Sequence, residues 1–489
     1  MLNLITDPWI FARRTDGSKT TIRPDQIADP SIAELDWPRP DLTLACYELL
    51  IGLVYLACPP QNARASSARP DQAALQQALL PLGPAFNLLG RGSLFLQDQQ
   101  AFNDVPDPPD MLFIDSAGRS TAKKNADLMV KRDRYTTLSL PLAAMALFTL
   151  QAFAPSGGAG NRTSMRGGGP MVTLVLPEGG LWDMIWANVP YGSPLADLTR
   201  LPWMRPTEVS DKKQIKVPPG DGTGPPDPEV FFGQPRRLRL VGDARGVTGV
   251  IQKPWGTNYV GWVHPLSPYY MLTGQKLPRH PKPGPFGYRN WGGVTFQTTG
   301  AEVARNLYQY NGAHQGEDYR LLVAGWAMSN MSPLDFLWSE QPVFPLDIAA
   351  VDKAAALVEA AEKTALVLAS TVAQGSGEVE IGTGAGEQAR QSFFAETQGS
   401  FEVRLASMKS GIPDDLAKGW LADMAKVAVK LFRDAVLDGL ADMTPQRQHE
   451  AAKAWRRLNS ALSGGKAGKD IWKALGLEMP LVKKNKEVA

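Results

Sequence analysis

The amino-acid pattern changes near Leu346, and this change limits the folds open to the chain. Before Leu346, proline and glycine recur every few residues, and short β-like runs alternate with short apolar runs. After it, proline becomes rare, alanine becomes frequent, and apolar residues repeat at i, i+3, i+4 and i+7. That spacing places apolar side chains on one face of a helix. The sequence therefore predicts an α+β protein, with an irregular mixed body over residues 1–345 and a C-terminal four-helix bundle over residues 346–489.

The periodicity also predicts individual elements. In the body, Pro/Gly-rich residues 218–228 are expected to form an exposed loop or to be disordered. Helices are expected over residues 42–57, 72–80, 138–153 and 181–188, and strands over residues 171–176, 237–241 and 259–263. The bundle helices are expected over residues 347–373, 388–408, 413–440 and 445–462, with a short extra helix over residues 469–475.

Composition excludes several classes of protein. A chain of 489 residues with 44% hydrophobic content can bury more than one core. The two cysteines lie in an apolar stretch without a C-x-x-C pattern, which favours buried thiols of a reducing compartment over disulfides or a zinc site. The N-terminus lacks the basic region of a signal peptide, and no segment offers about twenty uninterrupted apolar residues. We therefore expect a cytoplasmic protein without a membrane partner.

Positive charge is concentrated locally although the formal net charge is only +2. Residues 119–134 hold six basic and two acidic residues, residues 236–253 hold five and one, and residues 276–289 hold four and none. Each stretch alone is typical of a solvated face. Three such stretches beside Gly-rich and Pro-rich loops favour a surface that binds a polyanion through several separate segments.

The segment P-S-G-G-A-G-N-R-T-S-M-R-G-G-G-P, residues 155–170, follows the apolar run 138–153 directly. Glycine permits a positive φ and close approach of the backbone where a Cβ atom would collide. Neither G-x-x-x-x-G-K-[ST] nor a G-x-G-x-x-G between a strand and a helix is present, so a phosphate-loop enzyme is disfavoured. A plain connection and a nucleic-acid-contacting loop both remain open on these residues.

Catalytic patterns are scarce in this sequence. The four histidines are widely separated, without H-E-x-x-H or H-x-E followed by C-x-x-C. No D-x-D or D-x-E cluster lies in an apolar strand, as a carboxylate two-metal site would favour. We expect no active site, no bound metal and no cofactor.

Five segments together resemble the CasA family, the large subunit of the type I-E CRISPR surveillance complex, Cascade. The resemblance covers essentially the whole chain, with the C-terminal helices in the family's place. The segments are N-L-I-T-D-P-W-I at the N-terminus, Asn125–Met129, the glycine segment ending in R-G-G-G-P, H-P-L-S-P-Y-Y at 264–270 and G-W-A-M-S-N-M at 325–331.

The resemblance implies a non-catalytic subunit that recognises the protospacer-adjacent motif in double-stranded DNA from the minor groove. Such a subunit starts strand separation for guide RNA pairing and helps recruit a helicase-nuclease. The implied partners are the other Cascade subunits, guide RNA, double-stranded target DNA and the helicase-nuclease effector. A stand-alone nucleic-acid-processing enzyme with an unrecognised site is the alternative.

Position by position, the resemblance assigns four groups of residues. The groups are a glycine loop of Gly157, Gly158, Ala159 and Gly160; a lysine finger at Lys276 or Lys282; a strand-separating wedge of Ser329, Asn330 and Met331; and an anchor loop for guide RNA and a neighbouring subunit of Asn125, Ala126, Asp127, Leu128 and Met129.

Some members of the family also carry a cysteine-rich zinc knuckle in the middle of the chain. Residues 236–259 contain no cysteine, so the resemblance implies no metal here.

Overall fold

The computed structural model describes residues 2–116, 134–158, 160–220, 222–314, 316–377 and 384–480. The chain divides into two compact units. The N-terminal unit comprises Met1–Pro285 and Gly300–Val343, and the helical unit comprises Phe286–Thr299 and Phe344–Ala489. Every strand among the described residues lies in the N-terminal unit, so the predicted α+β class is confirmed.

Two buried helices, α1 (Pro40–Ala57) and α5 (Leu140–Phe153), form the centre of the N-terminal unit. Both are apolar on nearly all sides, which is typical of helices enclosed by protein. Each begins with a proline in its first turn, where the missing N–H is not needed. The hydroxyl of Ser139 also accepts a hydrogen bond from the Leu142 N–H and so caps α5. Both helices match the predicted ranges closely.

Shorter helices surround this centre. Asp71 caps α3 by accepting from the Ala74 N–H at 2.8 Å. The predicted helices over residues 72–80 and 181–188 are confirmed as α3 and α6. The bounds are α2 (Ala63–Ser66), α3 (Gln72–Leu79), α6 (Leu181–Ala187) and α7 (Arg305–Ala313).

The strands form small antiparallel sheets in the orders β2-β1-β3, β11-β10-β4 and β8-β7-β9, beside the hairpin β5-β6. The predicted strands over residues 171–176 and 237–241 are confirmed as β4 and β5. The bounds are β1 (Ile10–Arg14), β2 (Lys19–Ile22), β3 (Ile32–Leu35), β4 (Val172–Leu176), β5 (Arg237–Asp243), β6 (Gly246–Lys253), β7 (Tyr269–Leu272), β8 (Gln275–Pro278), β9 (Ala301–Glu302), β10 (Tyr319–Ser329) and β11 (Ser332–Val343).

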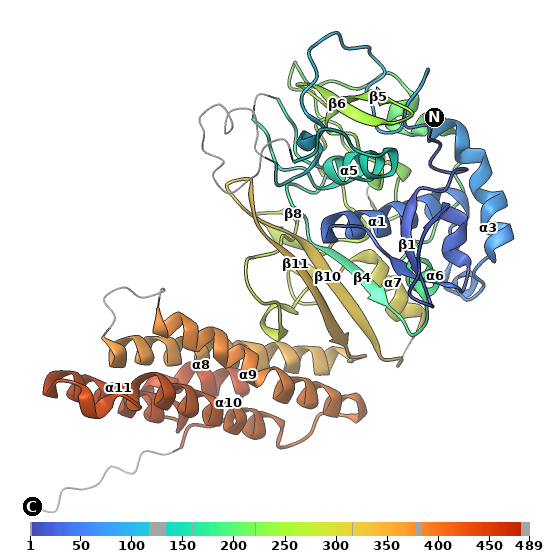
Figure 1. Ribbon diagram of the computed structural model, residues 1–489. Coiled ribbons are helices and arrows are strands. Elements are labelled where there is room, and N and C mark those ends of the chain that lie inside the picture. Colours follow the sequence, from blue (N-terminus) through green and yellow to red (C-terminus); the bar gives the residue numbers. More distant parts are fainter. Residues whose placement is uncertain are drawn as a thin grey trace, which may run out of the picture. The chain divides into compact units, whose positions relative to one another are not determined.

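The hairpin of β10 and β11 is the longest strand pair of the unit and carries the predicted wedge at its tip (Figure 1). β10 is central and largely buried, whereas β11 is an edge strand with many exposed residues. Ser329 pairs with Ser332, so Asn330 and Met331 form a two-residue turn. Both have a positive φ, +47° and +65°, as a type I′ turn requires.

The expected strand over residues 259–263 is wrong. Tyr259 makes only an isolated bridge to Lys216, and none of the residues 259–263, all of which are described, belongs to a strand. Its apolar side chains pack in another way, since Trp262 is buried and Tyr259 is half-buried. The Pro/Gly-rich stretch 218–228, apart from residue 221, is irregular and mostly exposed, as predicted.

The helical unit contains the predicted four long helices and the short extra helix (Figure 1). Asp347 caps α8 by accepting from the Ala350 N–H at 2.8 Å, and Gly377 ends it with φ +68°. The predicted third helix ends early as an α-helix, because a π-helical turn, Arg433–Leu437, follows α10. The bounds are α8 (Ile348–Ser376), α9 (Ala385–Ser407), α10 (Leu416–Phe432), α11 (Pro445–Leu462) and α12 (Lys469–Leu475).

Residues 286–299 lie apart in sequence from these helices but pack into their core. Tyr288 stacks on Phe401 with ring centroids 4.2 Å apart, and Trp291 packs edge-on against the same ring. Trp420 donates its indole N–H to the Leu357 carbonyl at 3.0 Å. The helical unit therefore includes an aromatic segment that lies between two parts of the N-terminal unit in the sequence.

α1 is the one described helix that is long and apolar enough to cross a membrane by length and composition, and most of it is buried inside the N-terminal unit. Its Cys46 is fully buried, and Cys58 follows its last residue. Twelve residues of helix separate the two by about 18 Å, well beyond the span of a disulfide. Both are free thiols.

Candidate nucleic-acid interface

The glycine segment 155–170 leaves the end of α5 and contains an exposed turn. Ser156, Gly157 and Gly158 are exposed, and Gly158 has φ +66°. The turn closes through two backbone hydrogen bonds, from the Gly157 N–H to Asn161 and from the Asn161 N–H to Gly158. The N–H groups of Ser156 and Gly158 make no hydrogen bond within the described residues. The exposed turn therefore offers two backbone donors.

Gly158 and Gly160 are required for different reasons. A Cβ atom on Gly158 would meet nothing within 4 Å. One on Gly160, where φ is +79°, would lie 2.7 Å from the indole ring of Trp255. Glycine at 160 is thus needed for internal packing, whereas the space over Gly158 is open to a ligand. The intervening Ala159 of the predicted loop lies outside the described residues.

A buried guanidinium supports the exposed turn. Arg236 is 6% exposed and donates to the carbonyl oxygens of Pro155 (2.5 Å) and Arg162 (2.7 Å). Burial lowers the pKa of Arg236 to about 10, so it remains charged at neutral pH. No carboxylate pairs with it among the described residues. Its positive charge lies directly beneath the turn and favours an anion above it.

Arg166, one of the two arginines of the glycine segment, has a structural role. It forms two hydrogen bonds with the carboxylate of Glu48 on α1, at 2.7 and 2.8 Å, and both side chains are about 2% exposed. It also donates to the Ser267 hydroxyl at 3.1 Å. Burial and this cation hold the pKa of His264 well below its usual range. Arg166 therefore fixes the second half of the glycine segment to the core.

That second half brings the hairpin tip against the glycine segment. A Cβ atom on Gly168 would lie 2.7 Å from the Pro155 Cα and 3.4 Å from the Met331 sulfur. One on Gly169 would lie 2.4 Å from the Trp326 carbonyl oxygen. The glycines of R-G-G-G-P thus allow the β10–β11 hairpin to approach. The predicted glycine loop and wedge, far apart in sequence, are neighbours in the fold.

The predicted wedge residues are exposed at this tip. Ser329 and Asn330 are exposed, and Met331 is 48% exposed although its sulfur faces Gly168. An exposed, unbranched Met side chain is costly in water and adapts readily to an apolar surface. The tip therefore carries an amide and a thioether that can contact another molecule.

The two lysine candidates differ in their surroundings. Lys276 on β8 forms an ion pair with Glu302 and lies 5.6 Å from the ring centroid of Tyr269. Lys282 is exposed and has no ion pair among the described residues. It follows His280, whose Nε2 lies 2.9 Å from a Cβ position on Gly167, and Pro281, which packs against Gly325 of β10. Lys282 is thus joined directly to residues that contact the glycine segment and the hairpin.

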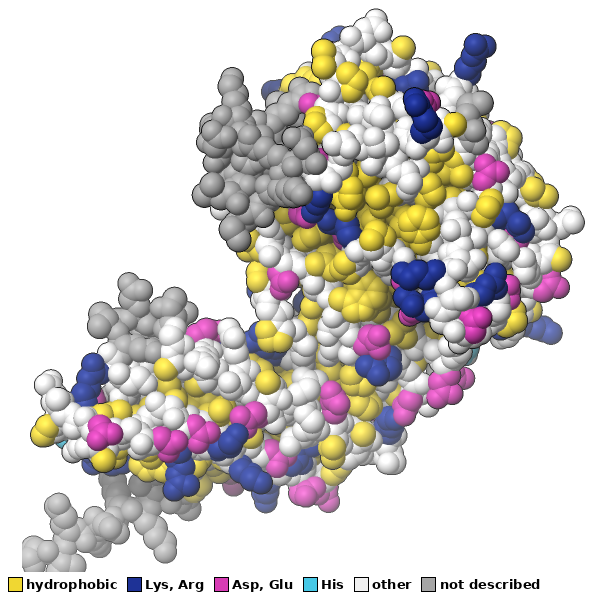
Figure 2. Space-filling model, viewed as in Figure 1, with side chains coloured by type: hydrophobic (Ala, Val, Ile, Leu, Met, Phe, Trp, Pro, Cys, Tyr) yellow, Lys and Arg dark blue, Asp and Glu magenta, His cyan; other side chains and the backbone are white. Residues whose placement is uncertain are grey.

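Five of the ten basic residues that the structure describes in the three basic stretches form ion pairs within the fold, namely Arg134, Arg237, Arg245, Lys253 and Lys276. Arg237 pairs with Asp98 at 2.6 Å, and Lys253 pairs with Asp104 at 2.6 Å. On the face drawn in Figure 2, basic and acidic side chains are intermingled. The footprint for a polyanion is therefore narrower than the basic stretches suggest. The stretch 119–134, except Arg134, and the anchor loop Asn125–Met129 lie outside the described residues.

Trp255 was not singled out from the sequence, yet it lies against the glycine loop. It is 40% exposed, has φ +65°, and its N–H donates to the Gly160 carbonyl at 2.8 Å. The only local signal is the turn pattern Pro254-Trp255-Gly256, which gives no indication of exposure.

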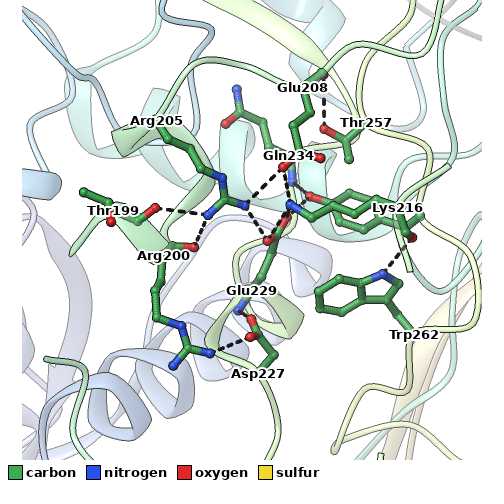
Figure 3. Close-up of polar contacts among 11 residues, drawn as sticks. Thr199, Arg200, Arg205, Glu208, Lys216, Asp227, Glu229, Gln234, Thr257 and Trp262 are labelled. Carbon is green, nitrogen blue, oxygen red and sulfur yellow. Dashed lines mark hydrogen bonds and ion pairs between the residues drawn. The ribbon is translucent and has the colours of Figure 1, made fainter. Parts of the chain in front are cut away.

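A polar network lies in the same part of the unit (Figure 3). Glu229 is 3% exposed and accepts from Arg205 (2.7 Å), Lys216 and the hydroxyl of Tyr259 (2.7 Å). Burial and the Glu229 charge raise the pKa of Tyr259 well above its usual value. No group of three or more His, Cys, Asp or Glu side chains that could hold a metal occurs in the described part of the chain. Ion pairs and packing hold this region.

Comparison with known proteins gives one matching family and a set of similar structures. The family model of CRISPR-associated protein Cse1 matches residues 3–431. CasA of Thermus thermophilus is 17% identical over 97% of this chain and 99% of that chain, with a TM-score of 0.71. Cse1 of Thermobifida fusca is 19% identical over 97% and 98%, with a TM-score of 0.71. A chain of a CRISPR RNA-guided surveillance complex is 15% identical over 94% and 99%, with a TM-score of 0.69. The curated proteins gave no match.

Proposed function

The chain belongs to the CRISPR-associated protein Cse1 family, and we propose on that basis that it is the non-catalytic large subunit of a type I-E surveillance complex acting in the cytoplasm. In this role it recognises the protospacer-adjacent motif in double-stranded DNA from the minor groove and starts strand separation for guide RNA pairing. The matched chain of an RNA-guided surveillance complex supports other subunits and guide RNA as partners.

One observation carries this proposal: the tip of the β10–β11 hairpin lies against the glycine segment that also carries the exposed turn. The Met331 sulfur lies 3.4 Å from the Cβ position of Gly168, in the same segment as Gly158. A backbone surface and an exposed apolar side chain are therefore side by side. These are the two features needed to contact a groove and to enter a neighbouring base step.

The chemistry of the exposed turn suits the minor groove. The floor of that groove presents acceptors on every base pair and one added donor on guanine. The free N–H groups of Ser156 and Gly158 complement those acceptors, and the absence of a side chain at Gly158 permits close approach. The buried charge of Arg236 attracts the phosphates without reading sequence. Lys282, or Lys276 after release from Glu302, supplies the long cation of the proposed finger.

The hairpin tip then acts as the wedge. Opening one base step costs on the order of 1–2 kcal/mol of stacking. The Met331 side chain replaces part of that stacking with apolar contact, and the Asn330 amide hydrogen-bonds an exposed base edge. Because guide pairing and duplex opening nearly balance, a contribution of this size decides the direction. The loop Asn125–Met129 is proposed to anchor the subunit to the guide RNA and its neighbour, and the helical unit to contact partners and the helicase-nuclease.

The proposal is tested by reconstituting the complex on one guide RNA with and without this chain. Binding is measured to duplexes that share the guide-matched sequence and differ only in the flanking motif. We expect the chain to confer a motif preference on intact duplex and none on a fully single-stranded target. Motif-independent binding in its presence would contradict the proposal, and divalent-metal-dependent cleavage by the purified chain would favour the enzyme alternative.

A further inference from the structure

Trp255 combines three properties that rarely occur together. It is a bulky residue with φ +65°, a conformation that such residues seldom adopt. It is 40% exposed, which leaves indole surface in water. Its ring lies directly on a glycine, because a Cβ atom on Gly160 would be 2.7 Å from it. Backbone strain held at an exposed aromatic residue is typical of a binding position.

The backbone around Trp255 is fixed from both sides. Its N–H donates to the Gly160 carbonyl at 2.8 Å, and its own carbonyl accepts from the Ser210 N–H at 3.0 Å. The Ser210 hydroxyl donates to the Gly256 carbonyl at 2.7 Å. Trp255 therefore joins the glycine loop to the segment that begins at Ser210.

One cation lies beside the exposed ring, and two more lie on the segment that Trp255 contacts through Ser210. The Arg162 guanidinium lies 5.4 Å from the ring centroid and is oriented by Ser210, which accepts from its Nε at 2.9 Å. Its Nη1 has no hydrogen bond within the described residues. Lys212 and Lys213 are exposed in the turn after Ser210, where the Lys213 N–H donates to the Ser210 carbonyl. Asp211 is the one acid in this turn, and it accepts from Gln214.

The network in Figure 3 holds both segments in place. Lys216 pairs with Glu208 and Glu229 at 2.6 and 2.8 Å, and its N–H donates to the Asn258 carbonyl. The Thr257 hydroxyl donates to the Glu208 carbonyl at 3.4 Å. Lys216, after the Ser210–Lys213 turn, thus binds both Glu208, before the turn, and the buried Glu229. Through Thr257 and Asn258 the same network holds the backbone that follows Trp255.

We propose that Trp255 is a stacking platform for an unpaired nucleotide of the opened DNA target, on the strand displaced by the guide RNA. An exposed indole beside guanidinium and ammonium groups matches the chemistry of single-strand binding, where bases stack on aromatic rings and cations follow the phosphates. The inference rests on the proposed function, because contact between Trp255 and Gly160 places the platform beside the motif-reading loop. Arg162, together with Lys212 and Lys213, binds the phosphates of that strand next to the stacked nucleotide.

Photochemical crosslinking tests this contact in the assembled complex. 5-Iodouracil is placed singly at successive positions of the displaced strand, on a motif-bearing target, and crosslinked peptides are mapped by mass spectrometry. We expect one or two adjacent positions near the motif to crosslink to Trp255. Crosslinks to the displaced strand that map only elsewhere, or crosslinks from the guide or target strand, would overturn the proposal.

Variants give an independent readout. Trp255→Asn removes the ring while suiting the left-handed backbone, Trp255→Phe keeps an aromatic face, and Trp338→Asn removes a comparably exposed indole on β11 (39%) as the control. From the usual stacking free energy of one base on an aromatic ring, Trp255→Asn should weaken the affinity for a displaced-strand oligonucleotide about 5- to 150-fold. Trp255→Phe should lose less and the control nothing.

The same samples separate this inference from the proposed function. If wild-type complex shows motif-dependent duplex binding but equal displaced-strand affinity for all three variants, the platform is refuted and the proposed function stands. If motif dependence is absent in the wild type, the proposed function fails first. A thermal unfolding midpoint matching the wild type confirms that each variant retains its fold.

Discussion

Placing a side chain on Gly158 is expected to block groove reading while the loop keeps its shape. Asparagine is the informative choice, because it tolerates a left-handed backbone better than other side chains and the residue has φ +66°. Nothing lies within 4 Å of the new Cβ atom, so the protein itself accommodates the change. Only a molecule pressed against the turn would collide with it. Gly160 is unsuitable for this test, because its substitution displaces Trp255.

The expected loss follows from the backbone donors of the turn. Among the exposed residues of the turn, Ser156, Gly157 and Gly158, the N–H groups of Ser156 and Gly158 make no hydrogen bond within the described residues. Each hydrogen bond to a groove acceptor contributes about 0.5–1.5 kcal/mol net. Losing both removes about 1–3 kcal/mol, which corresponds to a roughly 5- to 150-fold weaker association.

The assay is fluorescence anisotropy of the reconstituted complex on a motif-bearing duplex and on a duplex with the motif scrambled. Gly17→Asn is the matched control, since Gly17 has φ +84°, is exposed, and also has nothing within 4 Å of a Cβ position. We expect Gly158→Asn to lose affinity for the motif-bearing duplex and to keep its weaker binding to the scrambled one. Wild-type affinity and motif preference in Gly158→Asn would refute the assignment of the turn to the groove.

Three further predictions concern charge, stability and thiol chemistry. Lys282→Ala should reduce the slope of log affinity against log salt concentration by about one. Lys276→Ala should change this slope less, because Lys276 already pairs with Glu302. DNA titrations at several salt concentrations measure both slopes, and the reverse order would make Lys276 the finger. Glu48→Gln leaves the Arg166 charge buried without its carboxylate and should destabilise the N-terminal unit by about 3–5 kcal/mol, so an unchanged denaturation midpoint would contradict the anchoring role. Burial raises the pKa of Cys46 to about 12, so about one thiol in ten thousand is ionised at pH 8, and its alkylation should await unfolding; rapid labelling of folded protein would show otherwise.

The helical unit was the most predictable part of the chain. Its helices follow a sustained apolar period, and local signals such as the cap at Asp347 and the glycine at 377 mark their ends. The contribution of Tyr288 and Trp291 to its core was not predictable, because it depends on packing between distant segments. The apolar residues of segment 259–263 suggest a strand, but Trp262 is buried and Tyr259 half-buried through side-chain contacts, and the segment makes only one isolated bridge.

In the candidate interface too, features set by a residue and its sequence neighbours were predictable, whereas contacts between distant segments were not. Glycine permits the positive φ found at Gly158 and Gly160, but the residue type does not impose it, since Gly157 and Gly168 of the same segment lack it. Pairing of Arg166 with Glu48, across 118 residues, could not be read from the sequence, and neither could the ring of Trp255 on Gly160. Residue counts identified where cations are frequent, but only the fold shows which of them are already neutralised.

The wedge at the hairpin tip is the central claim, and the rate of strand opening tests it most directly. Asn330→Gly with Met331→Gly removes both side chains and keeps the turn, since glycine suits the two positive φ values. Stopped-flow fluorescence of a base analogue next to the motif is recorded on a fully paired target and on one already mismatched there. We predict that the variant associates with the intact duplex at the wild-type rate. On the paired target its strand opening should be about 5- to 30-fold slower, which corresponds to a stacking cost of about 1–2 kcal/mol. On the mismatched target its strand opening should match the wild type. An equal defect on both targets would show that these residues support docking or the fold and do not separate the strands.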